Sequence, residues 1–295
     1  MPSYDLAVAY RIYPRIAEAA RGLPFSHDKY KLADICLRSF RDSLGGLRVK
    51  MWVLADGCSP EYVDLFSSCF DPRSITVLSL DQIGNRATFA KQIDILLMQN
   101  SAEAVYFAED DYYYLPNQFH LMLQFMQAHP DVDFVTPYDH LDCYTLALHN
   151  RPEWLRVFGE HHWRTAASTC LTFLTTRRRL SETESVFRSY CRGNYDASLW
   201  LSLTKQAVFS PAALMRGPER HHMARVMAKT WLYGWRQVLA GKKRRLWVPV
   251  PGIATHLCAS ALSPGIDWRA LMLEASRSQA NSGEISTKNA NAVNV

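Results

Sequence analysis

Several features that point to particular classes of protein are missing from this sequence. No run of about 18 or more apolar residues is present, so no segment is predicted to span a membrane. The cysteines are scattered and never form a CxxC pair, which argues against a zinc knuckle or a disulfide framework. Met1 to Leu6 lacks the basic-then-apolar pattern of a signal peptide. We therefore expect a cytoplasmic protein, with peripheral contact to a membrane as an open alternative.

The charge balance is only mildly basic. There are 33 Lys and Arg against 28 Asp and Glu among 295 residues. This excess suits an anionic small molecule or a phosphate-bearing lipid surface, and it does not require a nucleic acid partner. Much of it lies in two short clusters, residues 177–179 and 242–245. Each cluster is interpreted as a solvated face or loop, and the second also as a mobile loop that closes over a diphosphate or touches a lipid surface.

The first part of the chain alternates strand-like and helix-like segments, which predicts an α/β fold with a mostly parallel sheet and helices on both faces. The expected strands are residues 4–10, 49–55, 74–80 and 104–108, and the expected helices are residues 31–44, a segment starting near 59–61, and 87–99. Later elements are expected at residues 117–128 (helix), 133–136 (strand), 168–174 (strand), 197–204 (helix) and 217–239 (helix).

The alternation of strands and helices becomes less regular after residue 115, which predicts two halves of one domain. Residues 1–115 form the first half, and residues 116–276 form a second half that ends in a helical and loop extension. Residues 277–295 are polar and lack apolar periodicity, so a disordered tail is expected there.

Ligands of open parallel sheets bind outside the carboxyl ends of the strands, so polar residues at those ends are the first candidates for a site. Tyr10 and Arg11 follow the first strand, and Asp56 follows the second. The fourth strand runs into the triplet Glu109-Asp110-Asp111. Three adjacent carboxylates repel one another, and Mg²⁺ or Mn²⁺ with diphosphate oxygens would compensate them. A turn with solvated acidic side chains is the alternative.

The run Val-Tyr-Phe-Ala-Glu-Asp-Asp at residues 105–111 resembles the D-x-D-like signature of GT-A glycosyltransferases, especially the family 2 group. The resemblance implies the GT-A (Rossmann-like) fold and a nucleotide-sugar donor, with UDP favoured. It implies that Asp111 holds Mn²⁺ or Mg²⁺ and that Glu109 or Asp110 faces the nucleotide. The first position is Glu109 where the family has Asp, so its ribose contact is less firmly implied than the metal contact.

The same resemblance implies donor contacts near the first three strands. Arg11 and Tyr13 would lie beside the base, and Asp56 would accept a hydrogen bond from a base N–H. A helix would begin at the segment that contains Asn85, Arg86 and Lys91, where its N-terminal amides would meet an anion. A plain Asp-Gly turn at Asp56 and surface roles for Arg86 and Lys91 are equally compatible with the sequence.

In the second half, residues 193–200 resemble the family's acidic motif at a helix start, which implies that Asp196 is the general base of an inverting transfer. A helix N-cap is the alternative for Asp196. His256 would complete the metal shell, or it serves packing. Arg164 is placed on the acceptor side, and the acceptor itself is an unknown glycan, lipid-linked or small molecule.

Two other functions stay open on the sequence. A sugar-phosphate nucleotidyltransferase shares the nucleotide-binding sheet, but it should carry a Gly-rich loop after the first strand, and residues 9–14 contain no glycine. A non-catalytic nucleotide or sugar-binding module is the third possibility. The intact triplet and Asp196 favour the hexosyltransferase-like enzyme.

Overall fold

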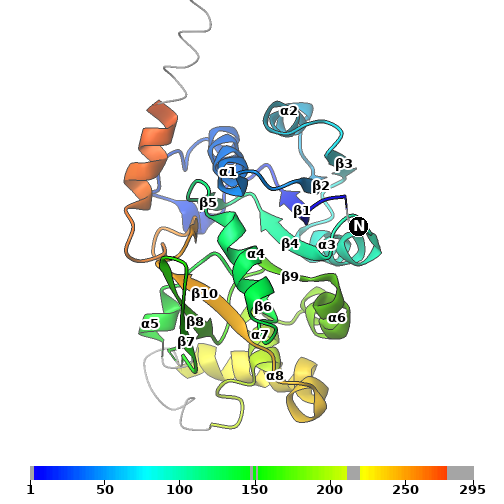
Figure 1. Ribbon diagram of the computed structural model, residues 1–295, viewed down its shortest axis with the longest axis vertical. Coiled ribbons are helices and arrows are strands. Elements are labelled where there is room, and N and C mark those ends of the chain that lie inside the picture. The colour runs from blue at the N-terminus through cyan, green and yellow to red at the C-terminus, as the bar shows by residue number, and fades with distance from the viewer. Residues whose placement is uncertain (1–2, 147–148, 151, 211–219, 278–295) are drawn as a thin grey trace, which may run out of the picture.

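The structure is a computed structural model that describes residues 3–146, 149–150, 152–210 and 220–277. In its first half strands alternate with helices (Figure 1). The elements are β1 (Leu6–Ile12), the 3-10 helix η1 (Glu18–Ala20), α1 (Lys29–Leu44), β2 (Val49–Asp56), α2 (Pro60–Cys69), β3 (Ile75–Leu80), α3 (Asn85–Met98), β4 (Ala104–Glu109) and β5 (Tyr112–Tyr114).

The second half adds shorter strands and most of the remaining helices. Its elements are α4 (Phe119–Ala128), β6 (Phe134–Val135), α5 (Asp142–Thr145), β7 (Leu155–Phe158), β8 (His161–Ala166), β9 (Phe173–Thr176), α6 (Arg177–Cys191), α7 (Asp196–Thr204), α8 (Arg220–Ala240), β10 (Leu246–Val250) and β11 (Ala254–His256). Nine strands form one sheet in the order β3-β2-β1-β4-β9-β6-β10-β8-β7, and β5 pairs with β11 in a second, two-stranded sheet.

The main sheet is mixed, and its parallel part holds the strand ends of interest. β1 pairs in parallel with β2 and with β4, and β2 pairs in parallel with β3. β9 joins antiparallel to β4, and β8 joins antiparallel to β10. The predicted α/β class is therefore confirmed, with antiparallel strands added at the second half.

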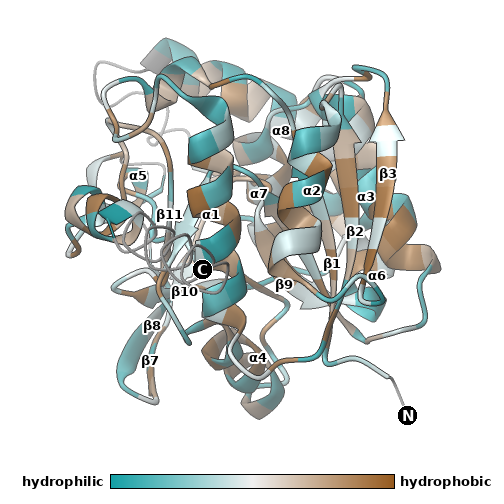
Figure 2. Cartoon of the chain, turned by 90° about the horizontal axis from the view of Figure 1, so that it is seen from above, coloured by the Kyte–Doolittle hydropathy of each residue, from teal (hydrophilic) through white to brown (hydrophobic). Residues whose placement is uncertain are grey.

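Strand alternation explains how helices cover both faces of the sheet. On β1, Val8 and Tyr10 belong to the core cluster formed with α1, α2 and α4, whereas Ala7 and Ala9 belong to the cluster formed with α3, α6 and α7. Figure 2 shows β2 and β3 as largely hydrophobic strands, and the burial of all of β1 and most of β2 is the pattern of a sheet covered on both faces. Arg11 therefore points to the α3 side of the sheet, opposite to Tyr10.

The expected elements of the first half lie within a few residues of the observed ones. In the second half the strand expected at residues 168–174 is shifted to β9, and the basic residues 177–179 begin α6 instead of a loop. The predicted C-terminal extension is confirmed, because residues 268–277 form a helix whose Trp268 and Met272 pack against α1. All but the first residue of the expected tail lie outside the described residues.

Among the described residues, the helices are too short or too polar for any of them to cross a membrane.

Candidate functional site

A cavity of about 540 Å³ lies where the carboxyl ends of β1, β2 and β4 meet. Arg11, Asp56 and the triplet Glu109-Asp110-Asp111 line it, so the sheet brings together polar residues that are up to 100 positions apart in the sequence. Tyr13, Lys29, Gly84 and Asn85 are among its other lining residues. This is the position at which open α/β sheets hold their ligands.

The fold gives each carboxylate of the triplet a cationic partner from a different element. Glu109 forms an ion pair with Arg11 of β1. Asp110 forms one with Lys29 of α1 at 2.6 Å, and Asp111 forms one with His256 of β11 at 3.2 Å. The mutual repulsion of the three carboxylates is therefore offset chiefly by protein side chains.

Further hydrogen bonds fix the first two carboxylates. The Thr172 hydroxyl donates to Glu109 Oε2 at 2.7 Å, and the Tyr13 backbone N–H donates to Asp110 Oδ2 at 3.1 Å. Burial raises the pKa of Asp110 above its ordinary value, although Lys29 acts in the opposite direction. These contacts hold Glu109 and Asp110 in place at the cavity wall.

The Asp111 and His256 pair differs from the other two in keeping a buried, unpartnered acceptor. His256 Nε2 contacts Asp111 Oδ2, while Asp111 Oδ1 is buried and has no hydrogen-bond partner among the described residues. Burial disfavours the charged imidazole, but the Asp111 carboxylate outweighs it and raises the pKa of His256 to about 9. Burial likewise opposes ionisation of Asp111, yet His256 lowers its pKa to about 2.

These two residues fit a partial metal site. The described residues contain no group of three or more His, Cys, Asp or Glu that could hold a metal ion. Asp111 and His256 are two candidate ligands, and the unpartnered Oδ1 is a carboxylate oxygen of the type that hard divalent ions prefer. Mg²⁺ typically takes one or two protein carboxylates and completes its octahedron with water and substrate phosphate. The donor set therefore suits an ion bound together with a diphosphate.

The turn before α3 is held by Asp56. The Ile83 and Gly84 backbone N–H groups donate to its two carboxylate oxygens, each at 2.8 Å. Gly84 has φ +82°, a left-handed conformation that favours glycine, and no side chain caps α3. Asp56 therefore fixes the N-terminus of α3 at the cavity, where helix amides and the helix dipole favour an anion.

The remaining predicted donor residues divide into two groups. Asn85 lines the cavity, accepts a hydrogen bond from Arg11 and donates to the Tyr190 hydroxyl at 3.2 Å. Arg86 and Lys91 are exposed on α3 and do not line the cavity. A surface role, which the sequence left open for both, agrees with this placement.

The structure corrects the interpretation of Tyr10. Its side chain is 1% exposed and packs against Phe40 and Phe66, with ring centroids 5.8 and 5.2 Å away. Successive residues of a strand point to opposite faces, so Tyr10 faces the core where Arg11 faces the cavity. Tyr10 is therefore a core residue.

A second, smaller cavity of about 250 Å³ contains Asp196. His140, His149, Ser168, Thr169 and Asp142 lie among its other lining residues. Glu109 and His256 both act on the pKa of Asp196, which places it within electrostatic reach of the first cavity. Asp196 therefore lines the second cavity within electrostatic range of Glu109 and His256.

Asp196 is the first residue of α7 and not its cap. Tyr195 occupies the N-cap position, and Asp196 Oδ1 accepts a hydrogen bond from the backbone N–H of Ala197 at 2.7 Å. An N-cap side chain would accept from a residue two or three positions further on. Burial raises the pKa of Asp196 above its ordinary value. The capping alternative is therefore wrong, and burial makes the side chain a stronger base than an ordinary aspartate.

Two histidines of the second cavity, His140 and His149, have pKa values below the ordinary value of a histidine. Burial lowers the pKa of His149 to about 4, and His149 Nδ1 lies 2.9 Å from the Ser168 hydroxyl. Burial also lowers the pKa of His140, against the opposing effect of Asp142. This part of the cavity wall offers hydrogen bonds without positive charge. The sequence carried no spacing signal for His140, His149 or Ser168, and none for Lys29.

Arg164 lies behind the second cavity. Its guanidinium donates to Asp139 at 2.6 Å and lies over the Tyr144 ring, 4.8 Å from the centroid. The side chain is buried and is not among the residues that line either cavity. The prediction that Arg164 lines the acceptor side is therefore corrected to a supporting role in the wall.

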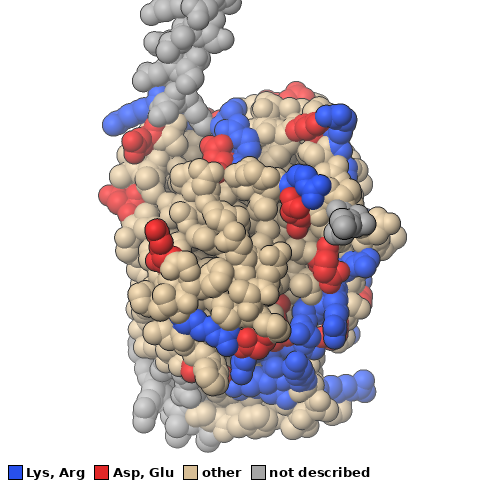
Figure 3. Space-filling view, viewed as in Figure 1, with Lys and Arg blue, Asp and Glu red and all other residues tan. Residues whose placement is uncertain are grey.

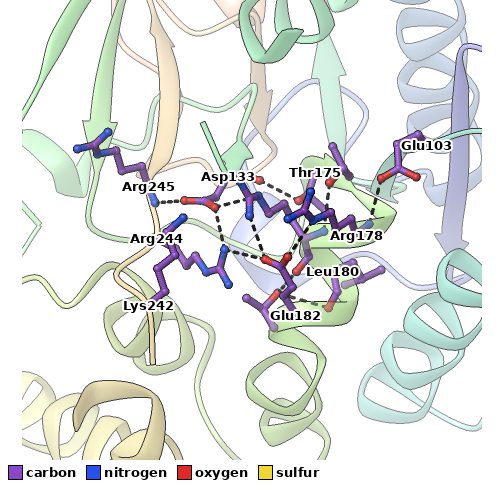
Figure 4. Close-up of polar contacts among 12 residues, drawn as sticks. Glu103, Asp133, Thr175, Arg178, Leu180, Glu182, Lys242, Arg244 and Arg245 are labelled. Carbon is purple, nitrogen blue, oxygen red and sulfur yellow. Dashed lines mark hydrogen bonds and ion pairs between the residues drawn. The ribbon is translucent and has the colours of Figure 1, made fainter. Parts of the chain in front are cut away.

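The two basic clusters meet each other away from the triplet (Figure 4). Arg179 and Arg244 both pair with Asp133, at 3.2 and 3.1 Å, and both pair with Glu182 at 3.0 Å. Arg245 donates its backbone N–H to Asp133 at 3.0 Å just before β10 begins. His256 follows the opposite end of β10. Residues 242–245 are thus tied into the fold, which corrects their interpretation as a loop that closes over the diphosphate.

Comparison with known proteins finds similarity in structure only. The sequence matches no protein-family model, and no curated protein matches it. A galactosyltransferase, LgtC, solved in complex with donor and acceptor sugar analogs, is 10% identical over 92% of this chain and 95% of that chain, with a TM-score of 0.43. A 4-diphosphocytidyl-2C-methyl-D-erythritol synthase from Anaerococcus prevotii is 9% identical over 69% of this chain and 84% of that chain, with a TM-score of 0.37.

The Asp111 and His256 pair predicts a defined pH dependence of stability in metal-free protein. The raised pKa of His256 contributes stability that is fully present below its ordinary value of 6.5 and is lost as the pH rises through about 9. His256→Gln leaves Asp111 without its charged partner and should lower the free energy of unfolding by about 1–3 kcal/mol at neutral pH. Urea unfolding followed by Trp fluorescence measures this difference.

The difference in the free energy of unfolding between wild type and His256→Gln should become smaller as the pH is raised to about 10. It should also shrink in acid, as the pH falls through the lowered pKa of Asp111, about 2. His27→Gln, at an exposed position, is the matched control and should show no such dependence. A difference that stays constant between neutral pH and about 10 would show that the pair is not ionised.

Proposed function

We propose that the protein is a metal-dependent glycosyltransferase that transfers a sugar from a nucleotide diphosphate sugar to an acceptor hydroxyl. The observation that carries this proposal is the buried, unpartnered Asp111 Oδ1 beside His256 at the strand-end cavity. The order of motifs along the chain supports the GT-A type and the family 2 group, and UDP is the favoured nucleotide. The described structure up to residue 115 forms the donor half, and residues 116–276 contribute the acceptor half.

Asp111 and His256 would hold Mn²⁺ or Mg²⁺ together with the donor diphosphate. The ion supplies positive charge that stabilises the departing diphosphate. Arg11 and Lys29 form ion pairs with Glu109 and Asp110 at the wall, and Asp111 is the triplet member with a buried, unpartnered oxygen. Asp56 fixes the N-terminus of α3 where its amides face the anionic donor.

Asp196 is proposed as the general base. The acceptor hydroxyl oxygen forms a bond to the anomeric carbon while the bond from that carbon to the diphosphate oxygen breaks, and the hydroxyl proton passes to the Asp196 carboxylate. Attack from the face opposite the leaving group inverts the configuration. Burial raises the pKa of Asp196, which makes the carboxylate a better proton acceptor.

The second cavity is the proposed acceptor site. Neutral His149, the Ser168 hydroxyl and Thr169 offer hydrogen-bond donors and acceptors suited to the hydroxyl groups of a glycan. Its position next to Asp196 presents such a hydroxyl to the donor side. A lipid-linked, polymeric or small-molecule acceptor would share this chemistry.

The donor site predicts metal-dependent nucleotide binding. UDP, or another nucleoside diphosphate, should bind in calorimetry with Mn²⁺ or Mg²⁺ and much more weakly with excess chelator. Asp111→Asn should weaken the metal-dependent binding by about tenfold or more, because a charged ligand is lost. Asp64→Asn, at an exposed carboxylate of α2, is the matched control. Equal affinity with metal and with chelator for every common nucleoside diphosphate would contradict the metal site.

The role of Asp196 predicts a loss of turnover without a loss of donor binding. Asp196→Asn removes the proton acceptor at nearly constant size and should lower kcat by about 10²- to 10⁴-fold. The affinity for nucleotide and metal should stay at the wild-type value. Asp142→Asn, at another carboxylate of the second cavity, should lower kcat far less. The assay uses the donor and acceptor pair that gives wild type its highest rate, and near-normal turnover of Asp196→Asn would place the base elsewhere.

A further inference from the structure

Helix α8 exposes a row of large apolar side chains that no described part of the fold covers. Leu232 is 70% exposed, Trp235 is 49% exposed and Leu239 is 60% exposed. Their spacing of three and four residues places them along one side of the helix. Monomeric proteins expose single apolar residues commonly, but a continuous row of this kind usually marks an interaction site.

An apolar depression continues this row. Ala224, Ala228 and Trp231 of α8 line it together with Phe209, and it has a volume of about 490 Å³. Phe209 is 65% exposed, and its ring lies edge-on to Trp231 at 5.8 Å between centroids. The row and the depression together form a surface that we call the α8 surface, made up of Phe209, Ala228, Trp231, Leu232, Trp235 and Leu239.

The α8 surface is not a by-product of poor packing. The opposite side of the helix is buried, with Val226 and Val238 each 1% exposed, and the Ser198 hydroxyl donates to the Val226 carbonyl at 2.8 Å. Helix α8 is thus fixed to α7 by a complete core face. The exposed row is additional to what the fold needs.

The charged side chains of α8 and of the segment that follows it have one sign. Residues 220–266 contain no Asp or Glu. Arg225 and Arg236 are exposed on the side of α8 next to the apolar row, and Lys242 is exposed just beyond the helix. In the view of Figure 3, Lys and Arg gather toward the lower end of the molecule, with some Asp and Glu among them, where Figure 1 places α6, α7 and α8.

We propose that the α8 surface docks the protein on an anionic lipid bilayer, with α8 lying in the plane of the interface. An amphipathic helix with aromatic and aliphatic residues on one face and Arg or Lys beside them is the pattern of interfacial helices. Trp235 has the amphipathic ring that favours the headgroup region. At roughly 1 kcal/mol per basic residue near an anionic surface, the flanking cations give a reversible attachment.

Charge complementarity selects a bilayer over a second copy of the chain. In a symmetric dimer the same patch meets itself, so two helices without acidic residues would face each other and their arginines would repel. An anionic bilayer offers both an apolar interior for the row and negative charge for its cations. This inference stands apart from the proposed function, because no residue of the α8 surface lines the strand-end cavity or the second cavity, to which α8 contributes His222.

The test is co-sedimentation of the full chain with vesicles. Wild type should bind vesicles of phosphatidylcholine and phosphatidylserine, bind pure phosphatidylcholine weakly, and lose binding as salt is raised, because surface charges are screened. The triple variant Leu232→Gln, Trp235→Gln, Leu239→Gln should bind the mixed vesicles about tenfold or more weakly, since it cannot bury the apolar row. Thermal unfolding and nucleotide affinity should be unchanged in this variant.

The matched control changes three equally exposed apolar residues elsewhere, Met98→Gln, Leu155→Gln and Val157→Gln, which are 84%, 66% and 70% exposed. This variant should bind vesicles as wild type does. Wild type that fails to bind the mixed vesicles, or an α8 variant that binds as well as the control, would overturn the proposal. A dimer in light scattering that the α8 variant abolishes, without vesicle binding by wild type, would also overturn it and assign the surface to a second copy.

Discussion

Three consecutive carboxylates at the end of a buried strand repel one another, and the fold depends on how that repulsion is offset. Arg11, Lys29 and His256 each meet one of them, and they come from the first strand, the first long helix and the last strand of the chain. Offsetting the repulsion therefore brings residues from the early and late parts of the sequence next to the triplet. It also fixes the cavity wall against which a charged ligand would bind.

The three pairs are not equivalent, and the proposed metal site rests on the difference. Arg11 and Lys29 are strong, permanent cations that keep Glu109 and Asp110 in place. His256 is a weaker cation that can lose its proton to become a metal ligand, and its partner Asp111 retains a buried, unpartnered oxygen. A divalent ion arriving with a diphosphate would replace the proton of His256 as the compensating charge.

The sequence predicted those parts of the fold and site that follow from local periodicity. Apolar runs ending in Arg11, Asp56 and the triplet located the strand ends, and parallel pairing brought these ends together. Alternation along β1 puts Arg11 and Tyr10 on opposite faces of the sheet, but it does not tell which of the two lines the cavity, because both faces are covered by core clusters. The pairings of Lys29 with Asp110 and of Arg164 with Asp139 depend on how helices and antiparallel strands pack, which no local pattern encodes.

The central claim is that Asp111 and His256 hold a divalent ion against a diphosphate. Pulsed electron paramagnetic resonance of Mn²⁺ with UDP tests it most directly, because an imidazole nitrogen bound to Mn²⁺ modulates the signal. Wild type should show this nitrogen coupling together with coupling to the phosphorus of UDP. His256→Gln should lose the nitrogen coupling, and His140→Gln should keep it. Nitrogen coupling that is absent from wild type, or that persists in His256→Gln, would contradict the account.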